Sequence, residues 1–191
     1  ADSLVQSYDS KQAFFGTNPI CFAAPRANEE PFCVDMAPTF IPWNKVLEHK
    51  ELEIDLENPV AIDKNGNPTC KPEEAKSLMP IGNYKGYALA AMVEVLCSIL
   101  SGMKFGPHIP SMYGSSIKKP RKLGQFYIIF KSDVNTSLSV FEKNLQRMSI
   151  EIREQHSVSN NTVKVPNDPQ ISFQEERTEN GIPVSDQVFK I

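Results

Sequence analysis

The sequence has little excess charge and no long hydrophobic run, and each shortage excludes a class of protein. Its 191 residues carry a formal net charge of −3, and basic residues gather only in one short run at 118–122. Nucleic-acid binding requires clustered surplus cations, so the composition argues against it. The longest apolar stretch, 88–100, is too short to cross a bilayer and contains Glu94, which predicts a helix outside the membrane.

Cysteines are few and widely spaced. The four, Cys21, Cys33, Cys70 and Cys97, lie too far apart in sequence to form a zinc knuckle or a redox pair. Three of them lie in apolar runs and are predicted to be buried free thiols. No secretory hydrophobic segment follows Ala1, which favours a reducing, cytoplasmic location.

Familiar catalytic and metal-binding patterns are also lacking. A turn-rich stretch at 63–74 spaces its oxygen ligands somewhat like a calcium loop, but Pro68 stands where such a loop needs glycine. The histidines have surroundings typical of structural residues: His49 on a solvated face, His108 between prolines and His156 after a charged helix end. There is no glycine-rich phosphate loop and no nucleophile elbow. We therefore predict no metal site and assign no catalytic residue within the chain.

Hydrophobic periodicity and turn residues predict alternating strands and helices, which is typical of the α/β class. The expected strands are two pieces within 12–25 on either side of a turn at 16–19, one at 31–37, and an interior strand at 125–130. The expected helices cover 40–52, a segment between Gly82 and Gly102, a segment from a capping box at 139–142 to about 155, and a polar stretch ending near Gly181. The second of these helices is apolar on nearly every side, so it should be covered by a sheet together with other helices or a second subunit.

Lys85 is the most informative single position. It lies where the apolar helix begins, between two glycines, and a cation there opposes the helix dipole by roughly 0.3 to 1 kcal/mol. An anion bound between the lysine and the first amide N–H groups would resolve the conflict. A lysine that simply extends into solvent is the alternative interpretation.

Two further charged residues are candidates for binding. Asp35 ends an apolar strand, where ligands of α/β sheets gather and where a carboxylate can accept ribose or amide hydrogens; it could equally cap a turn or a helix. Arg121, close before Gly124, could hold a substrate carboxylate through two parallel hydrogen bonds. A surface ion pair is the simpler alternative for Arg121.

Six motifs follow one another at sensible spacing along the chain. They are GTNPICFAAPR (16–26), CVDMAPT (33–39), LMPIGNYKGYALAAMVEVLCSILSG (78–102), FGPHIPSMYG (105–114), KPRKLGQFYIIF (119–130) and GIPVSD (181–186). In this order they resemble the malate/L-lactate/ureidoglycolate dehydrogenase family, and the likeness runs over nearly the whole chain.

The resemblance implies a three-layer α/β/α fold with a mixed sheet, a homodimer, and NAD or NADP bound without a Rossmann unit. The residues that it places at the site are Asp35, Met36, Ala37 and Lys85 along the cofactor, Asn167, Asp168 and Pro169 in a turn that closes over it, and Arg121 at the substrate. The family usually has glycine and then glutamate where this chain has Asn167 and Asp168. Asparagine tolerates a left-handed backbone, so the turn is expected to survive.

The resemblance also implies a reaction: hydride transfer between a small 2-hydroxy or 2-oxo acid and the nicotinamide. The family's general-base histidine belongs to an N-terminal segment that would precede Ala1. Residues 1–191 are therefore expected to be the cofactor-binding, C-terminal portion of the enzyme. The alternative is a degenerate family member or fragment that binds nucleotide or serves a structural role without catalysis.

Overall fold

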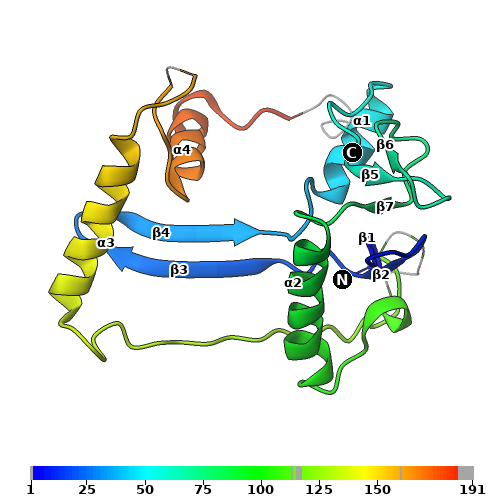
Figure 1. The fold of residues 1–191 in the computed structure, drawn as a ribbon, viewed down its shortest axis with the longest axis horizontal. Helices are drawn as coiled ribbons and strands as arrows, with labels where there is room; N and C mark the ends of the chain where they lie inside the picture. The colour runs from blue at the N-terminus through cyan, green and yellow to red at the C-terminus, as the bar shows by residue number, and fades with distance from the viewer. Residues whose placement is uncertain (1, 113, 115–117, 160, 185–191) are drawn as a thin grey trace. The chain divides into compact units, whose positions relative to one another are not determined.

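The computed structural model divides the chain into two compact units (Figure 1). It describes residues 2–112, 114, 118–159 and 161–184, so the motifs at 105–114 and 181–186 lie partly outside the described residues. The first unit contains Ala1–Ile20 and Asp35–Ile128, and the second contains Cys21–Val34 and Ile129–Ile191.

A five-stranded mixed sheet lies in the first unit. Its strands, in spatial order, are β2 (Ala13–Phe15), β1 (Val5–Gln6), β7 (Ser77–Leu78), β5 (Ala61–Ile62) and β6 (Pro68–Thr69). β1 pairs in parallel with β7, whereas the other neighbours pair antiparallel. The prediction of an α/β fold with a mixed sheet is therefore confirmed. The three-layer arrangement stays a prediction.

Helix α1 (Trp43–Glu51) closes one side of the first unit's core, where Val46 packs in a cluster with Leu56 and Leu78. The predicted helix is confirmed, but the expectation that His49 faces solvent is wrong, because only 8% of its surface is exposed. The chain folds back after the helix, so that Ile54 N donates to His49 O at 3.1 Å and His49 Nδ1 lies 3.0 Å from the Asp55 carbonyl oxygen.

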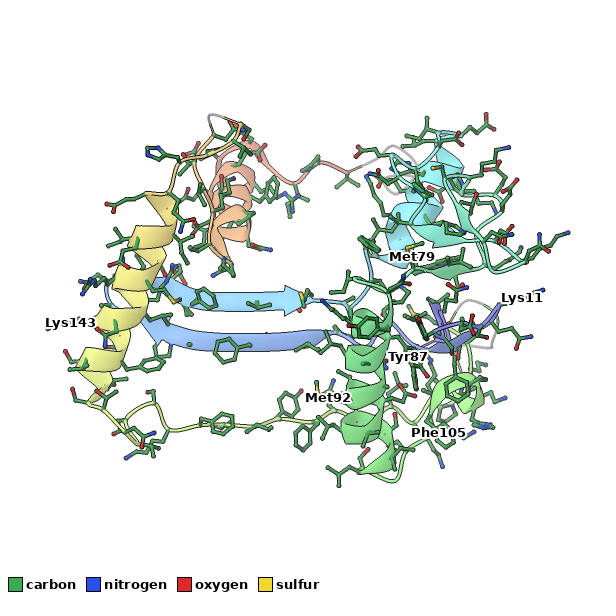
Figure 2. The ribbon with its side chains drawn as sticks, viewed as in Figure 1. Lys11, Met79, Tyr87, Met92, Phe105 and Lys143 are labelled. Atoms are coloured by element: carbon green, nitrogen blue, oxygen red, sulfur yellow. The ribbon has the colours of Figure 1, made fainter. Side chains whose placement is uncertain are left out.

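The long apolar helix is also confirmed. α2 (Tyr84–Glu94) continues into a π-helical turn, η1 (Val95–Ile99), and the segment ends at Gly102, whose φ of 68° only glycine adopts readily. A short 3-10 helix, η2 (Gly106–His108), follows. Tyr87 faces Phe15 of β2, with ring centroids 5.4 Å apart, while Met92, labelled in Figure 2, is exposed.

The outer face of this helical segment carries four exposed apolar side chains: Met92, Val95, Ile99 and Leu100. Only Gly86, Ala90 and Glu94 of α2 are buried. The coverage on several sides that the sequence predicts is thus not provided by the residues of the first unit that the structure describes.

The second unit contains a hairpin and two helices. β3 (Ile20–Arg26) and β4 (Glu29–Met36) form the two-stranded sheet, joined by a turn at residues 27–28, and their outer ends belong to the first unit. α3 (Leu138–Arg153) and α4 (Asp168–Asn180) follow in sequence. All four elements match predictions, and Gly181 ends α4 with a φ of 82°. The amide of Ala27 donates to the Glu142 carbonyl at 3.4 Å, linking the hairpin to α3.

The start of α3 differs from the predicted capping box. Ser137, not Ser139, is the N-cap residue, and its Oγ accepts a hydrogen bond from Val140 N at 3.4 Å. Ser139 already lies inside the helix. Two serines separated by one residue offer the same local cap, and the helix uses the earlier one.

The predicted interior strand at 125–130 is wrong. The segment belongs to no strand, and Ile129 and Phe130 are 94% and 81% exposed. A strand requires a neighbour that accepts and donates ladder hydrogen bonds, and none of the described segments pairs with this one. The apolar, β-branched and aromatic run QFYIIF therefore favours a strand for which the described residues supply no partner.

The four cysteines are thiols rather than disulfides, but the burial predicted for three of them is not deep. Cys21 is exposed and the other three are partly buried. Among the described residues, no helix is long and apolar enough to cross a membrane, and no group of three or more His, Cys, Asp or Glu side chains is arranged to hold a metal ion.

Candidate functional site

The predicted site residues fall in both units. Asp35–Ala37, Lys85 and Arg121 belong to the first unit, and Asn167–Pro169 belong to the second.

In the first unit, the end of β4 runs against the beginning of α2. Ile81 N donates to Pro38 O at 3.1 Å, and Phe40 N donates to Met79 O at 3.2 Å. These bonds fix the chain just after Ala37 against the turn that leads into the helix. The predicted cofactor residues Asp35–Ala37 and Lys85 therefore lie near one another in the first unit.

The close approach depends on Gly86. A Cβ atom at this position would lie 2.6 Å from both the nitrogen and the oxygen of Ile81 and 2.8 Å from Pro38 O. All three are backbone atoms, which cannot move aside as a flexible side chain can. Only glycine therefore allows the helix to begin this close to the strand end.

Lys85 is exposed at the second position of α2, but the amides around it are already engaged. Lys85 N donates to Gly82 O at 3.2 Å, Gly86 N to Ile81 O at 2.8 Å, and Tyr87 N to Asn83 O at 3.3 Å. The sequence argument, in which an anion binds both the lysine and the first amides, is revised accordingly. A ligand at this helix start would be held chiefly by the ammonium group.

Asp35 and Met36 are exposed, and Asp35 is the last residue but one of β4. Asp35 does not cap the next helix, because the N-cap position of α1 is Pro42. The alternative interpretation of Asp35 as a helix cap is therefore excluded for α1. Its carboxylate lies at the strand terminus, as the sequence predicts.

Arg121 is held by two parts of the first unit. Its Nε donates to Pro110 O at 2.8 Å, and its Nη2 pairs with the carboxylate of Asp2. Asp2 is nearly buried, with 10% of its side chain exposed against 24% for Arg121, so this is more than a surface ion pair. Sequence reasoning missed Asp2, because 119 positions separate it from Arg121.

The loop that carries Arg121 is also fixed from its other side. A Cβ atom on Gly124 would overlap the Cys97 carbonyl oxygen of the π-helical turn, so the loop backbone lies directly on η1. Ser101 Oγ donates to the same oxygen at 2.5 Å. The position of Arg121 is therefore tied to the irregular turn of the apolar helix.

In the second unit, the turn before α4 has the conformation predicted for it. Asn167, the N-cap residue, adopts a left-handed backbone with φ 84° and ψ −18°. Its Nδ2 donates to Pro31 O at 3.0 Å and so links the turn to β4. Asparagine can thus take the place that glycine has in the family pattern.

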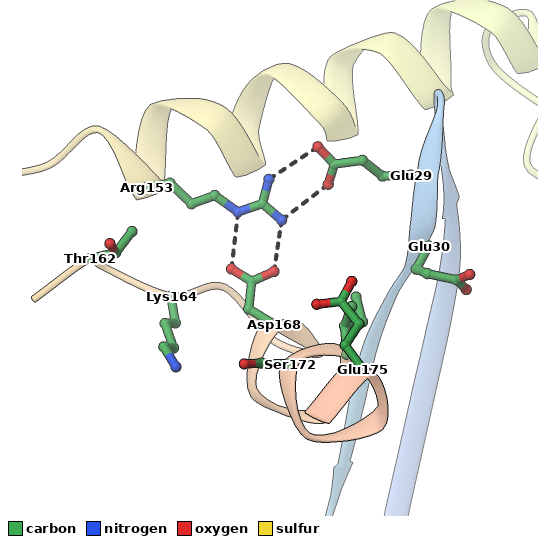
Figure 3. A pocket seen from close by; sticks show the side chains of 9 residues that line it. Glu29, Glu30, Arg153, Thr162, Lys164, Asp168, Ser172 and Glu175 are labelled. Carbon is green, nitrogen blue, oxygen red and sulfur yellow. Dashed lines mark hydrogen bonds and ion pairs between the residues drawn. The ribbon is translucent and has the colours of Figure 1, made fainter. Parts of the chain in front are cut away.

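Asp168 is bound by Arg153 of α3 (Figure 3). Arg153 Nε and Nη2 donate to Asp168 at 2.9 and 2.7 Å, and Nη1 and Nη2 donate to Glu29 of β4 at 3.1 and 3.0 Å. These charge-assisted hydrogen bonds hold the pKa of Asp168 and of Glu29 below their usual values, and they raise the pKa of Arg153. Asp168 also accepts a hydrogen bond from Val165 N at 3.0 Å. Its carboxylate is therefore engaged in contacts that stabilise the fold, and any cofactor contact at this turn would come from neighbouring atoms.

A fourth charge joins this cluster. The side chain of Arg26 is fully buried, and its Nη1 lies 3.3 Å from Glu29 Oε2. Beside the cluster is an open hollow of about 460 Å³, whose wall includes Thr162, Lys164 and Ser172 (Figure 3). Sequence reasoning singled out neither arginine: the partners of Arg153 lie on other elements, and Arg26 meets Glu29 across the turn of the hairpin.

Replacing Asn167 should separate the role of its backbone from that of its side chain. Asn167→Ala is expected to cost about 1 to 2 kcal/mol more stability than Asn167→Gly, because alanine is strained at positive φ and glycine is not. Both variants lose the bond to Pro31, so the difference reports the backbone alone. Urea denaturation measures it. Asn65→Ala, in an exposed turn, is the control, and equal stability of the two Asn167 variants would contradict the assignment.

Comparison with known proteins places the whole chain in one family. A family model described as malate/L-lactate dehydrogenase matches residues 1–191. The ureidoglycolate dehydrogenase (NAD(+)) of Escherichia coli K12 is 32% identical over 100% of this chain and 54% of its own length. The malate/(S)-sulfolactate dehydrogenase of Methanothermus fervidus is 30% identical over 99% of this chain and 54% of its own.

Solved structures share the fold. The crystal structure of malate dehydrogenase from Entamoeba histolytica has a TM-score of 0.88 and 21% identity, covering 100% of this chain and 56% of that one. This chain thus spans about half the length of the relatives that it matches. Taken with the family model along its full length, these matches establish that the chain belongs to the malate/L-lactate dehydrogenase family.

Proposed function

We propose that this chain forms the cofactor-binding portion of an oxidoreductase that transfers hydride between NAD or NADP and a small 2-hydroxy or 2-oxo acid. The observation that carries the proposal is the match of the family model to all 191 residues. The names of the relatives differ in substrate and in cofactor, so the proposal specifies only the class of acid. Hydride is supplied or accepted by the nicotinamide when it is bound.

The residues at the start of α2 fit such a cofactor. Lys85 offers an exposed ammonium group to a diphosphate, and Asp35 offers an exposed carboxylate that can accept ribose hydroxyl hydrogens. Met36 and Ala37 supply apolar surface beside them. In the second unit, the turn Asn167–Pro169 is the proposed closing element.

Arg121 is the proposed substrate residue, since a guanidinium can bind a carboxylate through two parallel hydrogen bonds. None of the three histidines fits the role of general base. His49 is buried against a backbone carbonyl and His108 packs edge-on against Phe105 at 5.0 Å, while His156 is exposed beyond α3. We propose that the base is a histidine outside residues 1–191. A homodimer and a cytoplasmic location are further parts of this proposal.

The second candidate is a nucleotide-binding or structural protein without catalysis. One experiment separates the two: titration of the full-length protein with NADH and NADPH by fluorescence, followed by turnover of a panel of 2-oxo acids. Saturable binding of either nucleotide together with turnover of at least one acid supports the enzyme. Binding without turnover favours the second candidate, and no binding contradicts both nucleotide-dependent proposals.

Lys85→Ala is expected to weaken cofactor binding about fivefold or more, because a charge-assisted contact to an anion is worth roughly 1 kcal/mol or more. The dissociation constant for NADH or NADPH, measured by fluorescence, is the test. Lys64→Ala, in an exposed turn of the same unit, is the matched control and should bind as wild type does. Equal dissociation constants for the Lys85 variant and wild type would remove Lys85 from the site.

A further inference from the structure

Within the described residues, the ion pair between Asp2 and Arg121 leaves part of the guanidinium without a hydrogen-bond partner. Arg121 uses Nε for Pro110 O and Nη2 for Asp2 Oδ1. A guanidinium is a planar fork of five N–H donors, and Nε and Nη2 lie along one edge of it. Neither bond uses Nη1, and no described residue accepts a hydrogen bond from it.

Asp2 is itself firmly held. Its second oxygen, Oδ2, accepts from Ser111 Oγ at 2.9 Å and from Met112 N at 2.7 Å. The arginine and its aspartate are therefore attached to one short stretch of backbone, 110–112, through Pro110 O on one side and Met112 N on the other. This arrangement restricts both the plane of the guanidinium and its direction.

Restriction of this kind suits a substrate-binding arginine. An arginine side chain loses about 2 kcal/mol of rotamer freedom when it is immobilised, and an arginine that is already fixed does not incur that cost again on binding. A guanidinium can bind a carboxylate bidentately by donating two parallel hydrogen bonds to it. With 24% of the side chain exposed, Arg121 remains accessible.

We infer that Asp2 is a positioning residue, which holds Arg121 so that the free end of its fork receives the carboxylate of a 2-oxo acid. This inference rests on the proposed function. It assigns Asp2 no contact with the substrate and no proton transfer. The opposite role, a competitor that occupies the place of the substrate carboxylate, predicts the opposite effect of removing its charge.

Asp2→Asn in the full-length protein distinguishes these roles. Loss of a hydrogen bond to a charged group should raise the KM for the 2-oxo acid, and the dissociation constant for oxamate in the presence of NADH, at least about tenfold. The dissociation constant for NADH should stay within about twofold of wild type. Asp9→Asn, which removes the same charge at an exposed position of the same unit, is the control and should leave all three constants unchanged.

Two results with Asp2→Asn would overturn the inference. Unchanged or tighter oxamate binding in Asp2→Asn means that Asp2 is a bystander or a competitor. Weakening of NADH and oxamate to the same degree means a general structural role. If Asp2→Asn does not fold, Asp2→Glu decides: it keeps the charge but shifts the guanidinium by one methylene, so a raised KM with normal NADH binding supports positioning and a wild-type KM contradicts it.

The wild type separates this inference from the proposed function. If the full-length wild type binds NADH but turns over no 2-oxo acid and binds no oxamate, the proposed function fails and Asp2 has nothing to position. If the wild type is active and Asp2→Asn matches it, only the inference about Asp2 fails.

Discussion

Replacing Gly86 with alanine is expected to lower the free energy of unfolding of the first unit by about 3 kcal/mol, the upper end of what overpacking usually costs. The added methyl group would meet Ile81 N and O and Pro38 O, all closer than 3.0 Å. Relief requires the helix start to separate from the strand end, which breaks the bond between Ile81 N and Pro38 O. Urea denaturation measures the loss.

The same substitution should also impair the candidate site. Separation of Pro38 from the helix start moves Asp35–Ala37 away from Lys85, so cofactor binding should weaken even in the fraction of protein that remains folded. Gly114→Ala is the matched control, because among the described residues the nearest atom to its added methyl group would be Ser111 Oγ at 3.7 Å, an ordinary contact. A Gly86→Ala protein as stable as the control variant would show that the helix start can move without cost.

Arg153→Met is expected to cost the second unit about 2 kcal/mol, less than for a fully buried ion pair because Arg153 is partly exposed. The change removes four hydrogen bonds and leaves the carboxylates of Glu29 and Asp168 facing each other without a cation between them. Arg147→Met is the control on the same helix, since Arg147 makes an exposed ion pair with Glu151. Equal stability of the two variants would contradict the role given to Arg153.

This effect should depend on pH in a defined direction. The pKa values of Asp168 and Glu29 are lowered in the folded protein, chiefly by hydrogen bonds from Arg153. Their stabilising contribution is therefore present above their usual pKa values of about 4 and is lost as the pH falls below them. The stability difference between wild type and Arg153→Met should be largest near pH 7 and should shrink below about pH 4. A difference that stays constant between these pH values would exclude the carboxylates as its source.

Elements with strong local signals could be predicted from the sequence. Apolar spacing and a terminal glycine defined α2, and the Asn167 turn followed from the tolerance of asparagine for positive φ. The prediction of a strand at 125–130 is wrong because an apolar, β-branched and aromatic run shows only what one segment favours, whereas a strand also needs a partner. The burial of His49 could not be predicted for the same reason, because it depends on how the chain folds back after α1.

The charged contacts of the candidate site could not be predicted, for a related reason. Arg121 was recognised as a possible carboxylate ligand, but its partner Asp2 lies 119 positions away. Arg153 had no local signal, because it lies at the end of an amphipathic helix and its partner Glu29 is 124 positions away. A sequence specifies such pairs only through the fold that brings them together.

The second unit is built from two segments that lie far apart in the sequence, Cys21–Val34 and Ile129–Ile191. This separation affects how the unit folds during translation. Its hairpin leaves the ribosome roughly 100 residues ahead of α3, an interval of roughly 5 to 20 s at ordinary rates of translation. A two-stranded hairpin is barely stable alone, and its open edges can pair with other chains. During that interval Glu29 has yet to meet Arg153. The nascent chain should therefore depend most on chaperones between synthesis of β4 and synthesis of α3.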